Sequence, residues 1–310
     1  MPHEFPKERQ DNCDEEHQGP IGRSKMPKLT LTVSVLLSTT IAIAYAQRAE
    51  KQEQVEIEQM TYPEIYSAIH DHGKTTVLVY NGGTEQRGPH AVLGGHTLMA
   101  HAIASMIARK LGNALVAPVL PFSVNPAGGV DAKWPGSVAL APDLFQKVNE
   151  AVVDSMVKNG FKNIVLLGDH GGGQAELGKL AETMDAKYGP QGTHVYFCGD
   201  VYEKSRLELA DWLTSKRLPL SNHAGISDTS TMLYLQPGRE QWVRNIYKTT
   251  IGDPVLSPGQ RPDPNVPRVN NGVTGDPRPS TPEIGKLVVE MKVNNAVAQI
   301  TRLIGAKTSR

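Results

Sequence analysis

The chain has 310 residues, with 32 basic and 32 acidic side chains and a formal net charge of zero. Nucleic-acid binding normally rests on a basic face, so this balance gives no reason to expect a nucleic-acid partner. Of the two cysteines, only Cys198 falls in the predicted folded part. A single thiol excludes a disulfide framework and a cysteine-based zinc site, so any metal ion must be held by His, Asp or Glu.

The N-terminus has the pattern of a secretory signal. A basic region precedes an apolar stretch at 29–43, and a small-x-small cleavage pattern follows at 44–46. We therefore expect residues 1–46 to be an N-terminal extension and cleaved signal peptide, with Met26 as an alternative start, and the protein to be secreted or periplasmic. An uncleaved anchor is the alternative, but the apolar stretch is shorter and more polar than a spanning helix needs.

Alternating strands and helices are predicted within residues 61–310. Continuous apolar and β-branched runs indicate buried strands at 75–80, 115–120, 163–167 and 194–198. Helical spacing of apolar residues predicts helices at 62–72, 96–111, 142–160, 174–188 and 283–304. This alternation predicts an α/β fold, with a parallel sheet covered on both faces.

Two segments lack these patterns. Residues 47–60 are polar and charged, which indicates a tether before the domain. Residues 253–282 are rich in Pro, Gly and Asn and predict a long loop, which is usually functional or a subunit contact.

Four side chains that can bind metal ions follow predicted strands in glycine-rich segments: Glu85, His90, His96 and His170. Ligands bind beyond the carboxyl ends of parallel strands, where these side chains can converge. A single loop histidine is ordinarily only solvated or hydrogen bonded, whereas three histidines with a glutamate indicate a metal site. Imidazoles and a carboxylate hold a divalent ion and leave a position open for water, whose pKa then falls toward neutrality.

Several blocks of the sequence resemble the creatininase (creatinine amidohydrolase) family. Residues 85–96 (EQRGPHAVLGGH) resemble the family segment EQHGPHLPLGTD, and residues 168–173 (GDHGGG) resemble NGHGGN. Further blocks follow in the family's order: WPGS, HAGISDTS, GVTGDP, and a threonine with Glu-x-Gly, at 134–137, 223–230, 272–277 and 281–285. The resemblance implies a three-layer α/β/α sandwich with a mainly parallel central sheet, commonly assembled as a hexamer. It also implies a metal-dependent amidohydrolase that holds two divalent ions.

The sequence departs from the family at the ligands of the second ion. The resemblance assigns the first ion to the Glu of EQH, the Asp of GTD and the His of NGH, and the second to the His of EQH, the shared Asp and another carboxylate. The second-ion positions are Arg87, His96 and Gly172 here. Guanidinium cannot ligate a metal ion, and imidazole cannot bridge two. We therefore predict one divalent ion held by Glu85, His96 and His170: zinc, with iron or manganese as alternatives.

Three further residues are predicted to act in catalysis: Arg87, His223 and Asp228. Arg87 is expected to replace the lost cation and to orient a substrate carboxylate or stabilise an oxyanion; the alternative is that it merely pairs with Asp228. The resemblance makes His223 the residue that shuttles a proton to the leaving nitrogen. Asp228 could ligate the metal ion, orient a ligating histidine, or pair with Arg87.

Other polar residues of the motifs are expected to support the site. Asp169 could tune His170 or cap the following helix. His90 is expected to be structural, and His101 to point to another face of its helix. Asp276 is expected to hold the C-terminal loop.

The predicted function is hydrolysis of an amide, lactam or related non-peptide C–N bond of a small-molecule substrate by metal-activated water. An ester or lactone hydrolase, a metal-assisted isomerase or lyase, and a non-catalytic periplasmic binding protein are the alternatives. Substrate specificity is expected in loops at 121–137, 200–225 and 253–280. We expect a homo-oligomer, a hexamer by the resemblance, with no stable membrane span after signal cleavage.

Overall fold

The structure is a computed structural model that describes residues 53–125, 133–238, 241–256 and 260–308. The chain divides into two units, 1–52 and 53–310, and every described residue belongs to the second. The predicted signal peptide and the start of the tether therefore lie outside the described residues. Within the described ranges, no helix combines the length and the apolar character that crossing a bilayer requires.

A parallel sheet of four strands in the order β2-β1-β3-β4 lies at the centre of the domain. The strands are β1 (Thr76–Asn81), β2 (Ala114–Val116), β3 (Asn163–Gly168) and β4 (His194–Phe197). Asn81 is paired with Gly168, so β1 and β3 end side by side. The segments that carry Glu85 and His170 therefore leave the sheet at the same edge.

Strand β2 is shorter than predicted. The apolar run continues to Leu120, but Pro118 has no backbone N–H to donate to a neighbouring strand. Beyond Val116, the contacts with β1 are isolated: the amide of Ala117 donates to the carbonyl oxygen of Leu78, and a single bridge joins Leu120 to Asn81. Proline therefore limits the strand although the run stays apolar.

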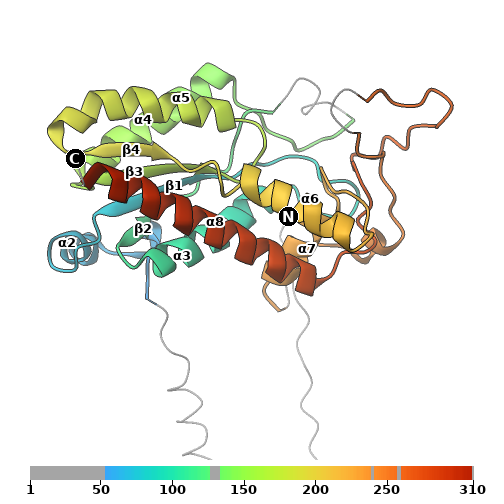
Figure 1. Cartoon of the computed structure of the whole chain (residues 1–310), viewed down its shortest axis with the longest axis horizontal. Helices are drawn as coiled ribbons and strands as arrows, with labels where there is room; N and C mark the ends of the chain where they lie inside the picture. The colour runs from blue at the N-terminus through green and yellow to red at the C-terminus, as the bar shows by residue number, and fades with distance from the viewer. Residues whose placement is uncertain (1–52, 126–132, 239–240, 257–259, 309–310) are drawn as a thin grey trace, which may run out of the picture. The chain divides into compact units, whose positions relative to one another are not determined.

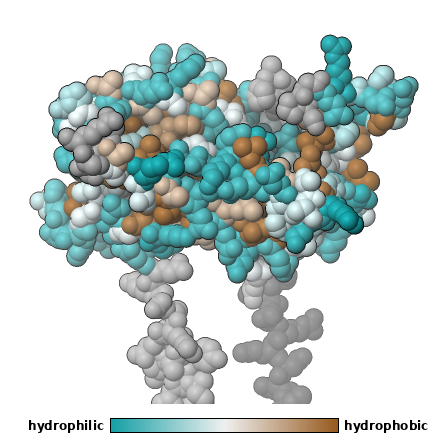
Figure 2. Space-filling model, in the orientation of Figure 1, coloured by the Kyte–Doolittle hydropathy of each residue, from teal (hydrophilic) through white to brown (hydrophobic). Residues whose placement is uncertain are grey.

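Helices cover both faces of the sheet (Figure 1). Helices α4 (Pro142–Lys158) and α5 (Gln174–Tyr188) lie on one face, and α3 (Gly95–Leu111) and α8 (Pro282–Thr308) on the other. A short helix, α2 (Tyr62–His70), precedes β1. On the face drawn in Figure 2, hydrophobic residues are scattered among hydrophilic ones. The predicted three-layer α/β/α sandwich is confirmed.

Two helices near the site were not predicted. Helix α6 (Glu203–Ser215) occupies half of the segment 200–225 that was expected to be a loop. It buries Ser205, Leu209 and Leu213. This four-residue spacing was visible in the sequence, but the many charges between these residues obscure it.

Helix α7 (Ile226–Leu235) contains most of the HAGISDTS block and packs along α8. A Cβ added at Gly285 of α8 would lie 1.9 Å from the carbonyl oxygen of Ser230. Only glycine allows this close approach of the two helices. The Glu-x-Gly block therefore has a packing role, which holds α7 beside the site.

The predicted tether ends earlier than expected. Val55 is fully buried, and its carbonyl oxygen accepts a hydrogen bond of 2.8 Å from the amide of Val116 in β2. Residues 57–59 form a short 3-10 helix. Residues 53–60 thus belong to the folded domain, because Val55, the free edge of β2 and polar contacts of Glu53 and Glu56 hold them there.

Candidate metal centre

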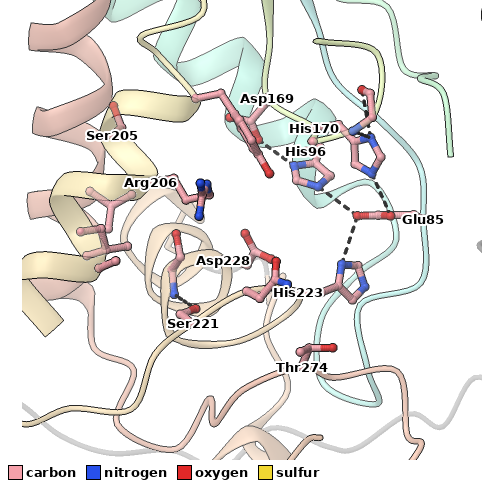
Figure 3. A pocket seen from close by; sticks show the side chains of 18 of the residues that line it. Glu85, His96, Asp169, His170, Ser205, Arg206, Ser221, His223, Asp228 and Thr274 are labelled. Atoms are coloured by element: carbon pink, nitrogen blue, oxygen red, sulfur yellow. Dashed lines mark hydrogen bonds and ion pairs between the residues drawn. The ribbon is translucent and has the colours of Figure 1, made fainter. Parts of the chain in front are cut away.

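Glu85, His96 and His170 converge at the carboxyl edge of the sheet (Figure 3). Glu85 follows β1, His96 lies in the first turn of α3, and His170 follows β3. Glu85 Oε1 lies 3.0 Å from His96 Nε2, and Glu85 Oε2 lies 3.0 Å from His170 Nε2. All three side chains are buried, and one donor atom of each lies within 4.8 Å of the others.

The proton positions on His96 fit a metal ligand. Its Nδ1 lies 2.8 Å from Asp169 Oδ2, and a carboxylate can only accept, so Nδ1 carries a proton. The lone pair of Nε2 then faces an oxygen of Glu85, an arrangement that needs a cation between the two atoms. A second proton on the ring can be that cation. Burial and the charge of Arg87 lower the pKa of His96, but hydrogen bonds with Asp169 and Glu85 outweigh them and raise it. A divalent ion suits the same donor set.

Glu85 stays ionised in this setting. Burial alone would raise its pKa, but hydrogen bonds with His170 and His96 and the charge of Arg87 hold the pKa well below its usual range. The other ring nitrogen of His170, Nδ1, accepts a hydrogen bond of 3.0 Å from the amide of Gly172 and lies 3.3 Å from the carbonyl oxygen of the same residue. With Nδ1 as acceptor, Nε2 carries the proton and donates it to Glu85 Oε2; a metal ion would take the place of that proton, with Nδ1–H then directed to the Gly172 carbonyl oxygen. The donor set therefore fits one divalent ion.

Asp169 has a partner that the sequence did not reveal. It was predicted to tune His170 or cap α5, but it instead binds His96, and Gly173 is the N-cap of α5. Lys292 of α8 lies 2.5 Å from Asp169 Oδ1, and both side chains are buried. Lys292 and His96 outweigh burial and hold the pKa of Asp169 well below its usual range. The Asn-to-Asp departure from the family motif is thus matched by a buried cation.

The carboxylate position of the second ion is closed. A Cβ added at Gly172 would lie 1.8 Å from the backbone carbonyl oxygen of Val124, so no side chain fits without a shift of that backbone. His96 offers no bridge, because its Nδ1 is committed to Asp169. These residues do not fit a second metal ion.

Arg87 lies beneath the site rather than on the wall of the cavity. Its side chain is 0% exposed, with Nη1 2.8 Å from Asp228 Oδ2 and Nη2 3.8 Å from Glu85 Oε1. None of its three guanidinium nitrogens has a well-aligned hydrogen-bond partner among the described residues, so the contact with Asp228 is an ion pair without hydrogen-bond geometry. Direct contact with a substrate, as predicted, would require Asp228 to move. The geometry instead matches the alternative, in which Arg87 pairs with Asp228.

Asp228 joins Arg87 to the loop that carries His223. Its Oδ2 also accepts a hydrogen bond of 2.8 Å from the amide of Ala224. Burial would raise the pKa of Asp228, but the charge of Arg87 outweighs it and lowers the pKa. Of the three roles considered for Asp228, the structure places it as the partner of Arg87.

His223 is directed at the candidate metal centre. Its Nε2 lies 2.7 Å from the backbone carbonyl oxygen of Gln86, which can only accept, so Nε2 carries the proton. The Gln86 side-chain nitrogen is 3.0 Å from the same ring nitrogen, and the Gln86 side-chain oxygen accepts a hydrogen bond from the amide of Gly88, so the shorter contact with the carbonyl decides the proton position. Nδ1 is left with a lone pair 3.4 Å from Glu85 Oε1. Burial lowers the pKa of His223 and favours this neutral form.

The remaining predicted residues lie outside the centre. His90 is buried and makes a 2.9 Å hydrogen bond with Thr229 of α7, and burial lowers its pKa to about 4, which suits a neutral structural histidine. His101 lies 3.7 Å from Glu58, away from the site. Asp276 accepts hydrogen bonds from Arg278 within the C-terminal loop.

A cavity of about 950 Å³ opens beside the centre. Its walls include Glu85, His96, His170, His223 and Asp228 together with residues that were not predicted individually: Tyr202, Arg206, Arg268 and Lys292. The predicted specificity segments at 200–225 and 253–280 both contribute to the walls. Tyr202, Arg206 and Lys292 lie on or next to α6 and α8 but outside the motif blocks, so no local pattern indicated them.

The fold and the site define an α/β protein with a candidate metal centre at the carboxyl edge of its sheet. The chain matches the profile of the creatininase family, described as creatinine amidohydrolase, over residues 58–300. It therefore belongs to the creatininase family and is a hydrolase of that family.

Relatives of known name or structure agree with this assignment. Mycofactocin precursor peptide peptidase of Mycolicibacterium smegmatis is 25% identical over 231 residues, which cover 73% of this chain and 84% of the relative. The protein of the same name from Mycobacterium tuberculosis is 23% identical over 244 residues, 73% of this chain and 85% of the relative. A crystal structure of creatinine amidohydrolase is similar with a TM-score of 0.63 and 20% identity, over 81% of this chain and 98% of that one. The same values apply to "Creatininase Mn" and to a mutant creatininase of "Zn-Zn type".

Proposed function

We propose that this protein hydrolyses the C–N bond of an amide with a single divalent metal ion held by Glu85, His96 and His170. The convergence of these three buried side chains on a cavity, with His223 directed at them, carries the proposal. A bound ion would polarise the amide carbonyl and lower the pKa of water at its open position. Zinc is the proposed ion, with iron or manganese as alternatives, because two imidazoles and one carboxylate are a common zinc ligand set.

The chain's own residues divide the remaining tasks. His223 is held through Nε2 and presents Nδ1 to the centre, where it can take a proton from the attacking water. The same nitrogen can then deliver that proton to the leaving nitrogen. Arg87 keeps Asp228 ionised and fixes the loop of His223 through Ala224, so its role is to position these groups.

The cavity favours a larger substrate than first predicted. Its volume of about 950 Å³ lies at the upper end of the range for pockets that enclose drug-sized ligands. The similar mycobacterial proteins are named as peptidases that act on a precursor peptide. Peptide bonds are therefore a second candidate, and the restriction to non-peptide amides is withdrawn. Membership of a hydrolase family weighs against the isomerase, lyase and binding-protein alternatives.

Removal of the metal ion tests the proposal directly. We expect the purified protein to contain about one divalent ion per chain, and a chelator to abolish turnover in a screen of amides and short peptides. One equivalent of zinc should restore the activity. Elemental analysis by mass spectrometry would count the ions, and two tightly bound ions per chain would overturn the single-ion proposal.

Replacement of His223 separates proton transfer from metal binding. His223→Asn is expected to lower kcat by about 10²–10⁴, the usual contribution of a positioned acid or base, while metal content stays unchanged. Steady-state kinetics and elemental analysis of the same preparation measure both. Loss of the ion from this variant would instead make Nδ1 of His223 a ligand.

Replacement of Arg87 should chiefly affect stability. Arg87→Met leaves the Asp228 carboxylate without its cation, so we expect the free energy of unfolding to fall by about 3 kcal/mol. Addition of Asp228→Asn should recover part of this loss, because it removes the unpaired charge. Urea unfolding measures both variants. An unchanged stability of Arg87→Met would show that the ion pair has no structural role.

We also propose that the protein is exported and forms a homo-oligomer. The signal pattern at 29–46 supports export, and the family resemblance supports a hexamer. N-terminal sequencing of the mature protein and a mass measurement in solution test these two points. An intact N-terminus, or a monomeric mass, would contradict the corresponding proposal.

A further inference from the structure

One face of helix α6 forms a long wall of the cavity. Its lining residues recur every three or four positions, on a single face of the helix: Tyr202, Ser205, Arg206, Leu209, Ala210 and Leu213. At 1.5 Å per residue, the distance from Tyr202 to Leu213 along the helix axis is about 16 Å. The cavity therefore extends along α6, and positions in it can be described by the α6 residue that lines them.

The N-terminal end of this wall lies at the metal centre. A Cβ added at Gly171, the neighbour of His170, would lie 2.6 Å from the hydroxyl of Tyr202. Burial raises the pKa of Tyr202 to about 12, so this hydroxyl stays protonated. The residues of α6 that follow Tyr202 are thus arranged at increasing distance from the centre.

Arg206 lies one helical turn farther along, about 6 Å from Tyr202 along the axis. Its side chain points into the cavity (Figure 3) and is about half exposed. Nε and Nη2 lie 3.2 and 2.6 Å from the carboxylate of Glu203, a contact that fixes the guanidinium. A guanidinium has five N–H groups, so this pair leaves donors for a ligand.

The charges on the cavity wall are unevenly distributed. The acidic lining residues, Glu85, Asp169 and Asp228, are all at the metal end and have partners there. The two arginines on the wall, Arg206 and Arg268, pair with Glu203 and Asp253, whose carboxylates are not among the described lining residues. This part of the cavity therefore favours an anionic group of the substrate.

The far end of the cavity is apolar. Leu209 and Leu213 of α6 and Val288 of α8 contact one another in a small hydrophobic cluster and also line the cavity. Each exposes only a few per cent of its surface, so this end is a narrow apolar floor. Along the wall, a hydroxyl, a guanidinium and an apolar floor follow one another from the metal centre outward.

We propose that α6 binds the leaving group of the substrate, and that this group is an apolar α-amino acid with a free carboxylate. The inference rests on the proposed amide hydrolysis. In an acylated amino acid, the carboxylate oxygens lie about 3 Å from the scissile nitrogen, and a hydrogen bond of about 2.9 Å then reaches a guanidinium. Arg206, one turn from Tyr202 on the same wall, presents its guanidinium to the cavity in which such a carboxylate would lie.

The substrate class is therefore an N-acyl amino acid, or a peptide with an apolar carboxy-terminal residue. Its carboxylate binds Arg206, and its side chain is directed toward Leu209, Leu213 and Val288. Water adds its oxygen to the acyl carbon and the C–N bond breaks. The leaving nitrogen gains both protons of the water. The products are an acyl carboxylate and an amino acid in its ammonium form, so atoms and charges balance.

Matched substrates test the proposal on the zinc-loaded full chain. The probes are N-benzoyl-leucine and N-benzoyl-phenylalanine, each as the free acid and as the carboxy-terminal amide, with release of the amine measured by mass spectrometry. We expect kcat/KM for the free acids to exceed that for the amides by at least about tenfold, because only the acids make a charge-assisted bond. Arg206→Gln should raise KM about 10- to 100-fold for the free acids and leave the amides unchanged.

Arg302→Gln is the matched control, because Arg302 is an exposed arginine of α8 that lies near Asp200 and is not among the cavity-lining residues. Equal hydrolysis of acids and amides, or an equal effect of Arg206→Gln on both, would overturn the inference and leave the proposed function intact. If no probe is hydrolysed, binding measured by calorimetry decides. The free acids should then bind the unaltered protein more tightly than Arg206→Gln. Equal affinity for the two proteins would mean that the carboxylate binds only the metal ion, and it would overturn the inference. Failure to bind zinc would instead count against the proposed function.

Discussion

Glu85→Gln is expected to abolish turnover and to weaken metal binding by more than about 100-fold. Both oxygens of Glu85 face histidine nitrogens at 3.0 Å, and the carboxylate supplies the only negative charge of the proposed ligand set. Glutamine keeps the volume but removes the charge and turns one oxygen into a donor. Loss of a partner that merely orients a ligand already costs 10- to 100-fold, so loss of a ligand should cost more.

Competition with a chromophoric zinc chelator measures the affinity, and the amide screen measures turnover. Glu58→Gln is the matched control, because Glu58 is a partly exposed glutamate that contacts His101 outside the site. Zinc binding by Glu85→Gln with the affinity of the unaltered protein would exclude Glu85 as a ligand. A loss of binding in the control as well would indicate a general effect on folding.

Asp169 and Lys292 are expected to be strongly coupled. Asp169→Asn leaves the buried ammonium of Lys292 unpaired, and Lys292→Met leaves the buried carboxylate with only His96 and, at 3.4 Å, the hydroxyl of Tyr80. Each single change should lower the free energy of unfolding by about 3–5 kcal/mol, the usual cost of an unpaired buried charge. The double variant removes both charges and should recover at least about 2 kcal/mol of the summed loss.

The same cycle has a readout at the metal centre. In the double variant, the side-chain amide oxygen that Asp169→Asn introduces can still accept the proton of His96 Nδ1, so zinc affinity should recover toward that of the unaltered protein. Urea unfolding of the metal-free protein and zinc competition provide the two measurements. Additive losses in stability, or no recovery of zinc affinity, would show that Lys292 does not act on His96 through Asp169.

The positions of Glu85 and His170 could be predicted because their cause is local. Continuous apolar runs identify β1 and β3, and parallel strands end at one edge of the sheet, so the residues that follow them meet there. His96 follows from the same argument, because α3 begins directly after that loop. The single-ion interpretation also began with residue chemistry, at Arg87 and Gly172.

The surroundings of these residues could not be predicted in the same way. Lys292 is 123 residues away from Asp169, and no periodicity joins them. The sequence left two roles open for Arg87, and only its burial and its 2.8 Å approach to Asp228 distinguish them. The closed space at Gly172 depends on a backbone carbonyl at Val124. Helix α6 was missed because its charges hide a four-residue spacing.

The sequence by itself determined the sheet, the family and the residue types that can hold a metal ion. These properties depend on hydrophobic periodicity and on the donor chemistry of individual side chains, both of which are local. Only the tertiary structure decided which charges pair in the interior, which side chains line the cavity, and that α6 places Arg206 on the cavity wall. Those outcomes depend on contacts between distant segments, whose distances are set by packing of the whole domain.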